Sequence, residues 1–186
     1  IMLSNASTPL LGIVDLAAVG RIGGAAPIGA VALGALVFTS VFWGFNFLRM
    51  ATTGLTAQSL GAGDHDALAD HLGRALLVAV VAGAALFALQ WPLSLVGFAL
   101  LDGSIEVESL ARDYVAIRFW SAPATLCNYA LLGWFIGLGR ARVALALQLI
   151  LNVTNIALDV IFVVGFGWGV QGVAAGSVIA EVLATV

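Results

Sequence analysis

The chain has 186 residues, of which 62% are hydrophobic and only 9% are charged, and its formal net charge is −3. A water-soluble domain would carry roughly 25% charged residues, so this composition predicts a protein that is solvated by lipid. The negative net charge argues against a nucleic-acid partner, which needs a basic face. The single cysteine, Cys127, excludes an internal disulfide.

Charges and turn residues divide the chain into six apolar runs, each long enough for a membrane-spanning helix of about 20 residues. Pro27 suits the first turn of the second run, and Ser104 with Glu106 suits the start of the fourth. The glycines at 165, 167 and 169 predict a hairpin between the last two runs. The sequence therefore predicts an all-α membrane protein, a bundle of six transmembrane helices at residues 1–20, 27–60, 68–101, 104–139, 142–165 and 169–186.

The two ends of the sequence lie within apolar runs, and the first residue is Ile1 instead of a methionine. We therefore expect residues 1–186 to form one lobe of a longer membrane protein, whose C-terminal lobe lies outside this sequence.

Small residues recur at every fourth position in two of the predicted helices. Gly172, Gly176 and Ala180 share one face of the sixth helix, and Gly133 and Gly137 share one face of the fourth. Such faces let helices approach closely in lipid, where hydrophobicity supplies no attraction between helices. We predict that both faces pack against neighbouring helices.

Three prolines, Pro9, Pro92 and Pro123, lie inside predicted helices. Each lacks the backbone N–H that would bond one turn upstream, so a kink is expected near each of them.

A polar stripe runs along the fifth predicted helix, in a stretch whose only charge is Asp159. Asn152, Asn155 and Asp159 are spaced i, i+3 and i+7, which places all three on one helix face. Three polar groups on one face predict that this face meets protein or a wet cavity and not lipid.

The hairpin brings further polar residues to the same level. With the turn centred near Trp168, Asp159 lies nine residues before it and Ser177 nine residues after it, each about 13 Å deep by helix rise. The same count puts Glu181 level with Asn155. We expect the fifth and sixth helices to present these side chains to each other.

Two other helices contribute polar residues at a similar depth. Asp15 and Asn128 each lie about ten residues from a helix end, hence about 15 Å deep. A carboxylate buried in a membrane can take up a proton, and carboxylate, amide and hydroxyl oxygens can together hold sodium. The cluster is predicted to be a coupling-ion site, with Asn128 and Glu181 lining a cavity. The alternative is that hydrogen bonds of these groups only fix the helices together.

No pattern in the sequence indicates a cofactor. His65 and His71 are not part of a metal-ligand motif. The glycines at 61 and 63 are not followed by the Gly-Lys-Ser/Thr of a phosphate loop. The expected ligands of the cluster are a proton or sodium, with no other metal.

Four segments carry a resemblance to a known family: PLLGIVDLAAVGRIG (9–23), FLRMATTGLTAQSLGAGD (47–64), RFWSAPATLCNYALLGWFIGLGRAR (118–142) and NIALDVIFVVGFGWGVQGVAAGSVIAE (155–181). They resemble the N-terminal half of the multidrug and toxic compound extrusion (MATE) efflux transporters, and the DinF-type bacterial branch in particular. The resemblance covers essentially the whole chain in order. It implies one six-helix lobe of a two-lobed transporter.

The resemblance also assigns roles to residues. It matches Asp15 to the family's acid in the first helix, Asn155 and Asp159 to its pair in the fifth, and Ser177 to its hydroxyl in the sixth. Relatives commonly have threonine where this chain has Leu16, so a hydroxyl beside Asp15 is missing. The resemblance further implies a cytoplasmic N-terminus, which puts the acid cluster in the outer half of the membrane.

The function implied is secondary active antiport, with export of cationic or amphipathic organic compounds in exchange for protons or sodium across a bacterial inner membrane. Its partners would be lipid, the substrate and the C-terminal lobe. One alternative is an intramembrane aspartyl protease with Asp15 and Asp159 as its dyad, although both acids lack the usual flanking signatures. Another is a lipid-linked oligosaccharide flippase of the same superfamily. Flippase cavities carry several cations, whereas the helix interiors predicted here contain none.

Overall fold

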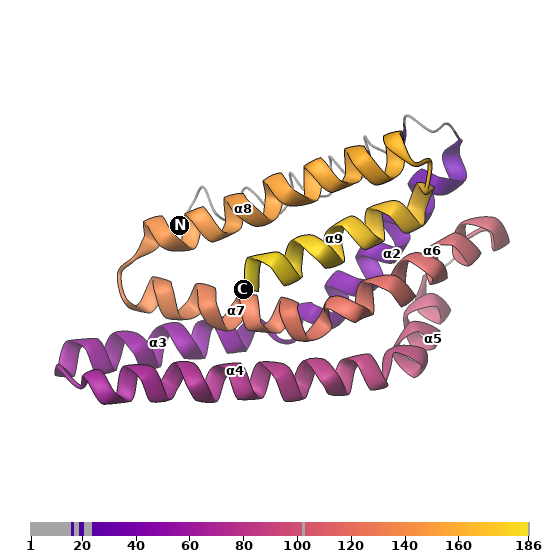
Figure 1. The fold of residues 1–186 in the computed structure, drawn as a ribbon. Helices are drawn as coiled ribbons and strands as arrows, with labels where there is room; N and C mark the ends of the chain where they lie inside the picture. The colour runs from indigo at the N-terminus through magenta and orange to yellow at the C-terminus, as the bar shows by residue number, and fades with distance from the viewer. Residues whose placement is uncertain (1–15, 17–18, 21–23, 102, 186) are drawn as a thin grey trace.

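The computed structural model describes residues 16, 19–20, 24–101 and 103–185, and nearly all of them are helical (Figure 1). No strand occurs in this part of the chain, which confirms the predicted all-α fold. The helices are, in chain order, α2 (Ala25–Trp43), α3 (Asn46–Ala62), α4 (His65–Ala88), α5 (Gln90–Leu100), α6 (Ile105–Arg118), the 3₁₀ turn η1 (Phe119–Ser121), α7 (Ala122–Gly137), α8 (Ala141–Asp159), the π-helical segment η2 (Val160–Gly165) and α9 (Gly169–Thr185).

Helix starts coincide with residues that favour them. Pro27 lies in the first turn of α2, as predicted. Ser104 precedes α6, and its hydroxyl accepts a hydrogen bond from the backbone N–H of Val107 at 3.4 Å. The predicted hairpin lies between η2 and α9, where Gly167 and Gly169 have φ values of +69° and +59°. These are left-handed conformations that favour glycine.

The predicted span 27–60 is divided between α2 and α3. The two helices separate at Gly44 and Phe45, where the backbone N–H of Phe45 donates to the carbonyl of Phe42 at 2.9 Å. A tighter turn of this kind interrupts the α-helical ladder without a proline.

Two further predicted spans are interrupted close to prolines. The helices α4 and α5 separate at Leu89, three residues before Pro92, and Figure 1 shows α5 turning away from the line of α4. The segment η1 separates α6 from α7, with Pro123 in the first turn of α7. Both breaks follow from the missing N–H and the bulk of the proline ring. Pro9 lies outside the described residues.

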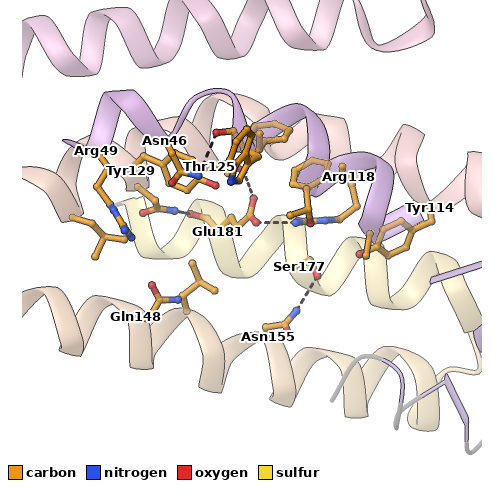
Figure 2. A pocket seen from close by; sticks show the side chains of 18 residues that line it. Asn46, Arg49, Tyr114, Arg118, Thr125, Tyr129, Gln148, Asn155, Ser177 and Glu181 are labelled. Atoms are coloured by element: carbon orange, nitrogen blue, oxygen red, sulfur yellow. Dashed lines mark hydrogen bonds and ion pairs between the residues drawn. The ribbon is translucent and has the colours of Figure 1, made fainter. Parts of the chain in front are cut away.

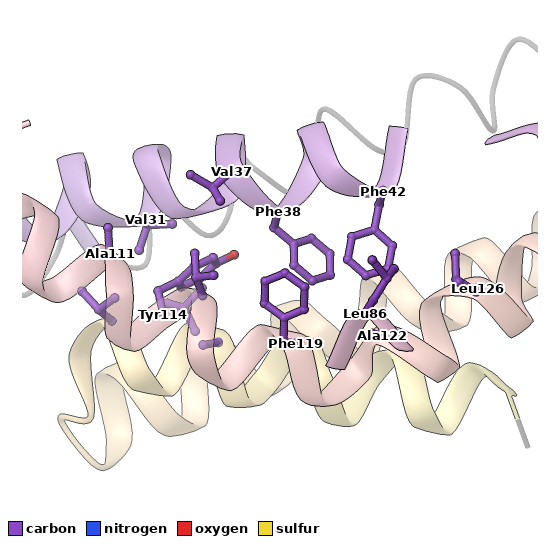
Figure 3. Close-up of a cluster of buried hydrophobic side chains, with 14 of the residues drawn as sticks. Val31, Val37, Phe38, Phe42, Leu86, Ala111, Tyr114, Phe119, Ala122 and Leu126 are labelled. Atoms are coloured by element: carbon purple, nitrogen blue, oxygen red, sulfur yellow. The ribbon is translucent and has the colours of Figure 1, made fainter. Parts of the chain in front are cut away.

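Contacts between neighbouring helices, several of them far apart in the sequence, hold the bundle together. The helix α7 packs on α3 and α4, α6 packs on α2 and α9, and α8 pairs with α9 in the hairpin (Figure 1). Where α2 meets η1, the rings of Phe38, Phe42 and Phe119 gather (Figure 3). The Phe38 and Phe42 rings are stacked with centroids 4.1 Å apart, and Phe119 approaches Phe38 edge-on at 5.9 Å. All three side chains are buried.

Glycines allow α7 to approach α3 closely. A Cβ built on Gly133 would lie 2.6 Å from the carbonyl oxygen of Arg49, and one built on Gly137 would lie 2.7 Å from that of Thr53. No side chain fits at such distances, so the predicted small-residue face of this helix is confirmed as a packing face.

The outer surface of the bundle is apolar. Large exposed side chains on α4 and α5 include Leu77, Val81, Trp91 and Leu100. Within the described residues, Ala25–Trp43, His65–Ala88 and Ala141–Gly165 are long and apolar enough to cross a membrane by length and composition. Of the other predicted spans, 104–139 is divided into shorter helices, 169–186 corresponds to the 17-residue apolar helix α9, and 1–20 lies almost wholly outside the described residues.

We expect substitution of Gly83 by alanine to destabilise the protein by about 1–3 kcal/mol, because the backbone must move to accept the methyl group. A Cβ at Gly83 in α4 would lie 2.4 Å from Cα of Pro123 in α7. Gly73 provides a matched control: it lies on the same helix, and a Cβ built there would meet nothing within 4 Å. Thermal unfolding of the full-length protein in detergent measures both variants. Equal unfolding temperatures for Gly83→Ala and Gly73→Ala would contradict the close contact.

Candidate functional site

A polar cleft of about 370 Å³ opens between the helices α2, α3, α6, α7, α8 and α9 (Figure 2). One part of its wall is aromatic and aliphatic, and the rest carries hydroxyl, amide and charged groups. Its polar lining among the described residues consists of Thr39, Asn46, Arg49, Tyr114, Arg118, Thr125, Asn128, Tyr129, Gln148, Asn155, Ser177 and Glu181.

The predicted polar stripe on α8 faces the inside of the protein. Asn152, Asn155 and Asp159 are all buried, with Asp159 fully inaccessible to solvent. The side-chain amide of Asn155 donates to the hydroxyl of Ser177 on α9 at 3.0 Å. The side-chain amide of Gln148 donates to the side-chain oxygen Oδ1 of Asn152 at 3.2 Å. The structure therefore brings Asn155 and Ser177 together, at the edge of the cleft that both residues line.

Asp159 lies behind this edge, at the contact between α8 and α9. A Cβ built on Gly176 would lie 2.7 Å from Oδ1 of Asp159, so a side chain at position 176 would displace the carboxylate. The backbone changes from α- to π-helical at Val160, directly after Asp159. This change was not predicted from the sequence. Single π-helical turns within α-helices frequently occur at functional positions.

An ion pair crosses the cleft from α6 to α9. Nη2 of Arg118 lies 3.0 Å from Oε1 of Glu181, and the two side chains are only 10% and 12% exposed. The guanidinium also lies over the ring of Phe38, with Cζ 4.1 Å from the ring centroid. The hydroxyl of Thr125 donates to the other carboxylate oxygen of Glu181. Glu181 thus lines the cleft, but its carboxylate is bound from α6 and α7 and is not presented to Asn155.

Asn128 connects α7 with the same end of α9. Its side-chain amide donates to the backbone carbonyl of Glu181 at 3.0 Å, and Asn128 also lines the cleft. The hydroxyl of Thr185 donates to the backbone carbonyl of Ala124 at 3.4 Å, one turn further along α9. These bonds fix the position of Glu181 relative to Arg118.

Sequence reasoning missed the role of Arg118. The structure places Arg118 in the interior of the bundle, so the expectation that the helix interiors contain no cation is wrong. A signal was available, because Arg118, Ser121, Thr125 and Asn128 are spaced i, i+3, i+7 and i+10. This is the same periodicity that identified the stripe on α8, and it places all four on one face of a continuing helix.

Asp15, the remaining residue of the predicted cluster, lies outside the described residues. Within the described part of the chain, no group of three or more His, Cys, Asp or Glu side chains is arranged to hold a metal ion. The groups that the structure assembles around Asn155 and Ser177 are oxygen-bearing, which suits protons and hard monovalent cations.

A family model described as MatE matches residues 1–161, which is most of the chain. The chain belongs to the MatE family. This confirms the family predicted from the four sequence segments, and it sets aside the aspartyl protease, because relatives in the MatE family are transporters and not enzymes.

Two curated relatives show the breadth of the match to MatE proteins. The DNA damage-inducible protein F of Escherichia coli K12 is 44% identical over 96% of this chain, and the multidrug resistance protein PmpM of Pseudomonas aeruginosa is 29% identical over 92%. The aligned part makes up 39% and 36% of those proteins, so the chain spans about two fifths of their length.

A solved structure supports the fold of this MatE chain. The outward-facing conformation of a multidrug resistance MATE family transporter of the MOP superfamily superposes with a TM-score of 0.89, at 23% identity. The matched region covers 100% of this chain and 41% of that transporter. The helical bundle is therefore a lobe of a MATE-type transporter.

Proposed function

We propose that this chain is the N-terminal lobe of a secondary active antiporter of the bacterial inner membrane. The whole protein exports amphipathic organic compounds in exchange for protons or sodium. The C-terminal lobe supplies the opposite wall of the substrate cleft, and lipid surrounds both lobes.

One observation carries this proposal: a fully buried carboxylate, Asp159, lies close to a cleft with polar lining in a bundle of apolar helices. Ionisable groups inside membranes are costly, and they mark ion and substrate pathways. Hydrophobic packing alone would be served better by an apolar residue at position 159.

The helix α9 connects the ion site with the cleft. Gly176 lies against Asp159. The next residue, Ser177, lines the cleft, and so does Glu181 one turn further along α9. Uptake of a proton or sodium at Asp159 removes a negative charge beside α9, so the preferred position of this helix differs between the two states. A substrate that favours one position of α9 is thereby linked to the ion, and each changes the affinity for the other by the same factor.

Transport by the reconstituted full-length protein tests the proposal. Liposomes are loaded with an aromatic cation and an aromatic anion together, so that the result does not depend on the charge of the substrate. An imposed proton or sodium gradient should accelerate release of at least one probe, and an ionophore that collapses the gradient should abolish the effect. If neither gradient changes the release of either probe relative to protein-free liposomes, the antiport proposal is wrong.

A further inference from the structure

The charges that line the cleft are unequal among the described residues. Two guanidinium groups, Arg49 and Arg118, face a single carboxylate, Glu181. Arg118 binds Glu181 directly at 3.0 Å, so this carboxylate is already engaged. None of the ion pairs formed within the described part of the chain involves Arg49.

Arg49 is positioned to meet a ligand. It lies in the first turn of α3, is partly buried, and reaches into the cleft, which Gln148 enters from α8 (Figure 2). Asn46 and Tyr129 line the same end. A guanidinium presents several N–H donors in a rigid fork that matches a carboxylate, sulfonate or phosphate group. Its amide and phenol neighbours supply further donors for such an anion.

Another part of the cleft wall is aromatic. Phe38, Phe42 and Trp43 of α2 line it, and the Phe38 ring is partly covered by Arg118. Aromatic walls bind flat apolar groups, whereas a few polar groups fix the orientation of a ligand in a pocket. The cleft thus combines an apolar surface with a cationic end.

We propose that the substrate is an amphipathic organic anion, whose acidic group binds Arg49 while its apolar part lies along the aromatic wall. This inference rests on the proposed export function. Of the cationic or amphipathic compounds expected from the sequence, it keeps the amphipathic character and replaces the cationic charge. The engaged state of Glu181 supports the replacement, because an organic cation would have to compete with Arg118 for that carboxylate.

Binding to the purified full-length protein tests the charge preference. The probes are 1-pyrenebutyrate and 1-pyrenemethylammonium, which share an aromatic body and carry opposite charges. We expect the anion to bind more tightly, and Arg49→Gln to weaken its binding about tenfold, the effect of losing a charge-assisted hydrogen bond. Arg49→Lys, which keeps the charge, should retain part of the affinity.

Arg74→Gln is the matched control, because Arg74 is exposed on α4 and paired with Asp70, away from the cleft. It should leave the binding of both probes unchanged. Tighter binding of the cation, or unchanged anion binding in Arg49→Gln, would overturn the inference.

Charge movement separates the failure of this inference from that of antiport. At one-for-one stoichiometry, export of a monovalent anion against a proton or sodium moves two charges per cycle, whereas export of a monovalent cation moves none. An inside-negative potential should therefore accelerate export in proteoliposomes. Gradient-driven export of the cation alone would support the antiport proposal and overturn the proposal of an anionic substrate. Anion binding that depends on Arg49, without gradient-driven export of either probe, would retain the binding site and overturn antiport.

Discussion

Replacement of Asp159 by asparagine should reduce export by the full-length protein to the level of protein-free liposomes, while insertion into the membrane stays intact. Asparagine has nearly the shape of aspartate, so it fits beside Gly176, where a Cβ would come within 2.7 Å of Oδ1. It cannot release a proton or carry the negative charge that holds sodium. The measurement is gradient-driven release of the probes, together with the amount of folded protein in the membrane.

The control for this variant is Asp113→Asn. Asp113 is exposed on α6, where its carboxylate accepts a hydrogen bond from Gln171 at 3.4 Å, and its replacement should leave export unchanged. A second readout separates an ion site from a purely structural role. Binding of an ion to the native state makes the unfolding temperature depend on sodium or pH, and this dependence should be lost in Asp159→Asn. Export at wild-type rates by Asp159→Asn would refute the assigned role.

The helix ends and the pairing of α8 with α9 could be predicted because local chemistry determines them. Ser104 caps α6 through its own hydroxyl, and the hairpin glycines adopt left-handed conformations. Once the hairpin was located, helix rise alone put Ser177 beside the polar stripe, where it binds Asn155. Each of these inferences needed only residues close together in the sequence.

The interruptions of the helices depend on contacts between residues that are far apart in the sequence. The break at Gly44 and Phe45 carries no proline, and the uncharged run continues through it to Leu48. Hydropathy reports whether a segment prefers lipid, but it does not report where a neighbouring helix bends it. The π-helical turn after Asp159 was missed for the same reason, since no residue in Val160–Gly165 marks it.

Arg118 shows a different limit of sequence reasoning. Its partner Glu181 is 63 residues away, so no local pattern connects the two. A charged residue next to an apolar run is ordinarily assigned to the membrane surface, because an unpaired charge in the bilayer is costly. The ion pair and the Phe38 ring offset that cost, and both become visible only in three dimensions.

Substitution of Arg118 by methionine should destabilise the protein by about 3–5 kcal/mol, because it leaves a buried carboxylate without its cation. Glu181 is held by Arg118 and Thr125, and a hydroxyl alone does not neutralise its charge. Methionine keeps most of the volume of the arginine stem, but it loses the guanidinium that lies over the Phe38 ring. Unfolding in mixed micelles with increasing SDS measures the free energy.

The double variant Arg118→Met/Glu181→Leu isolates the contribution of the pair. Removal of both charges eliminates the unpaired carboxylate, so the double variant should be more stable than Arg118→Met and within about 1 kcal/mol of wild type. Glu181→Leu alone provides the fourth corner of the cycle. If the free energy of unfolding of Arg118→Met lies within about 1 kcal/mol of the wild-type value, water in the cleft solvates Glu181 well enough to replace the guanidinium. The ion pair would then serve the binding properties of the cleft and not the stability of the bundle.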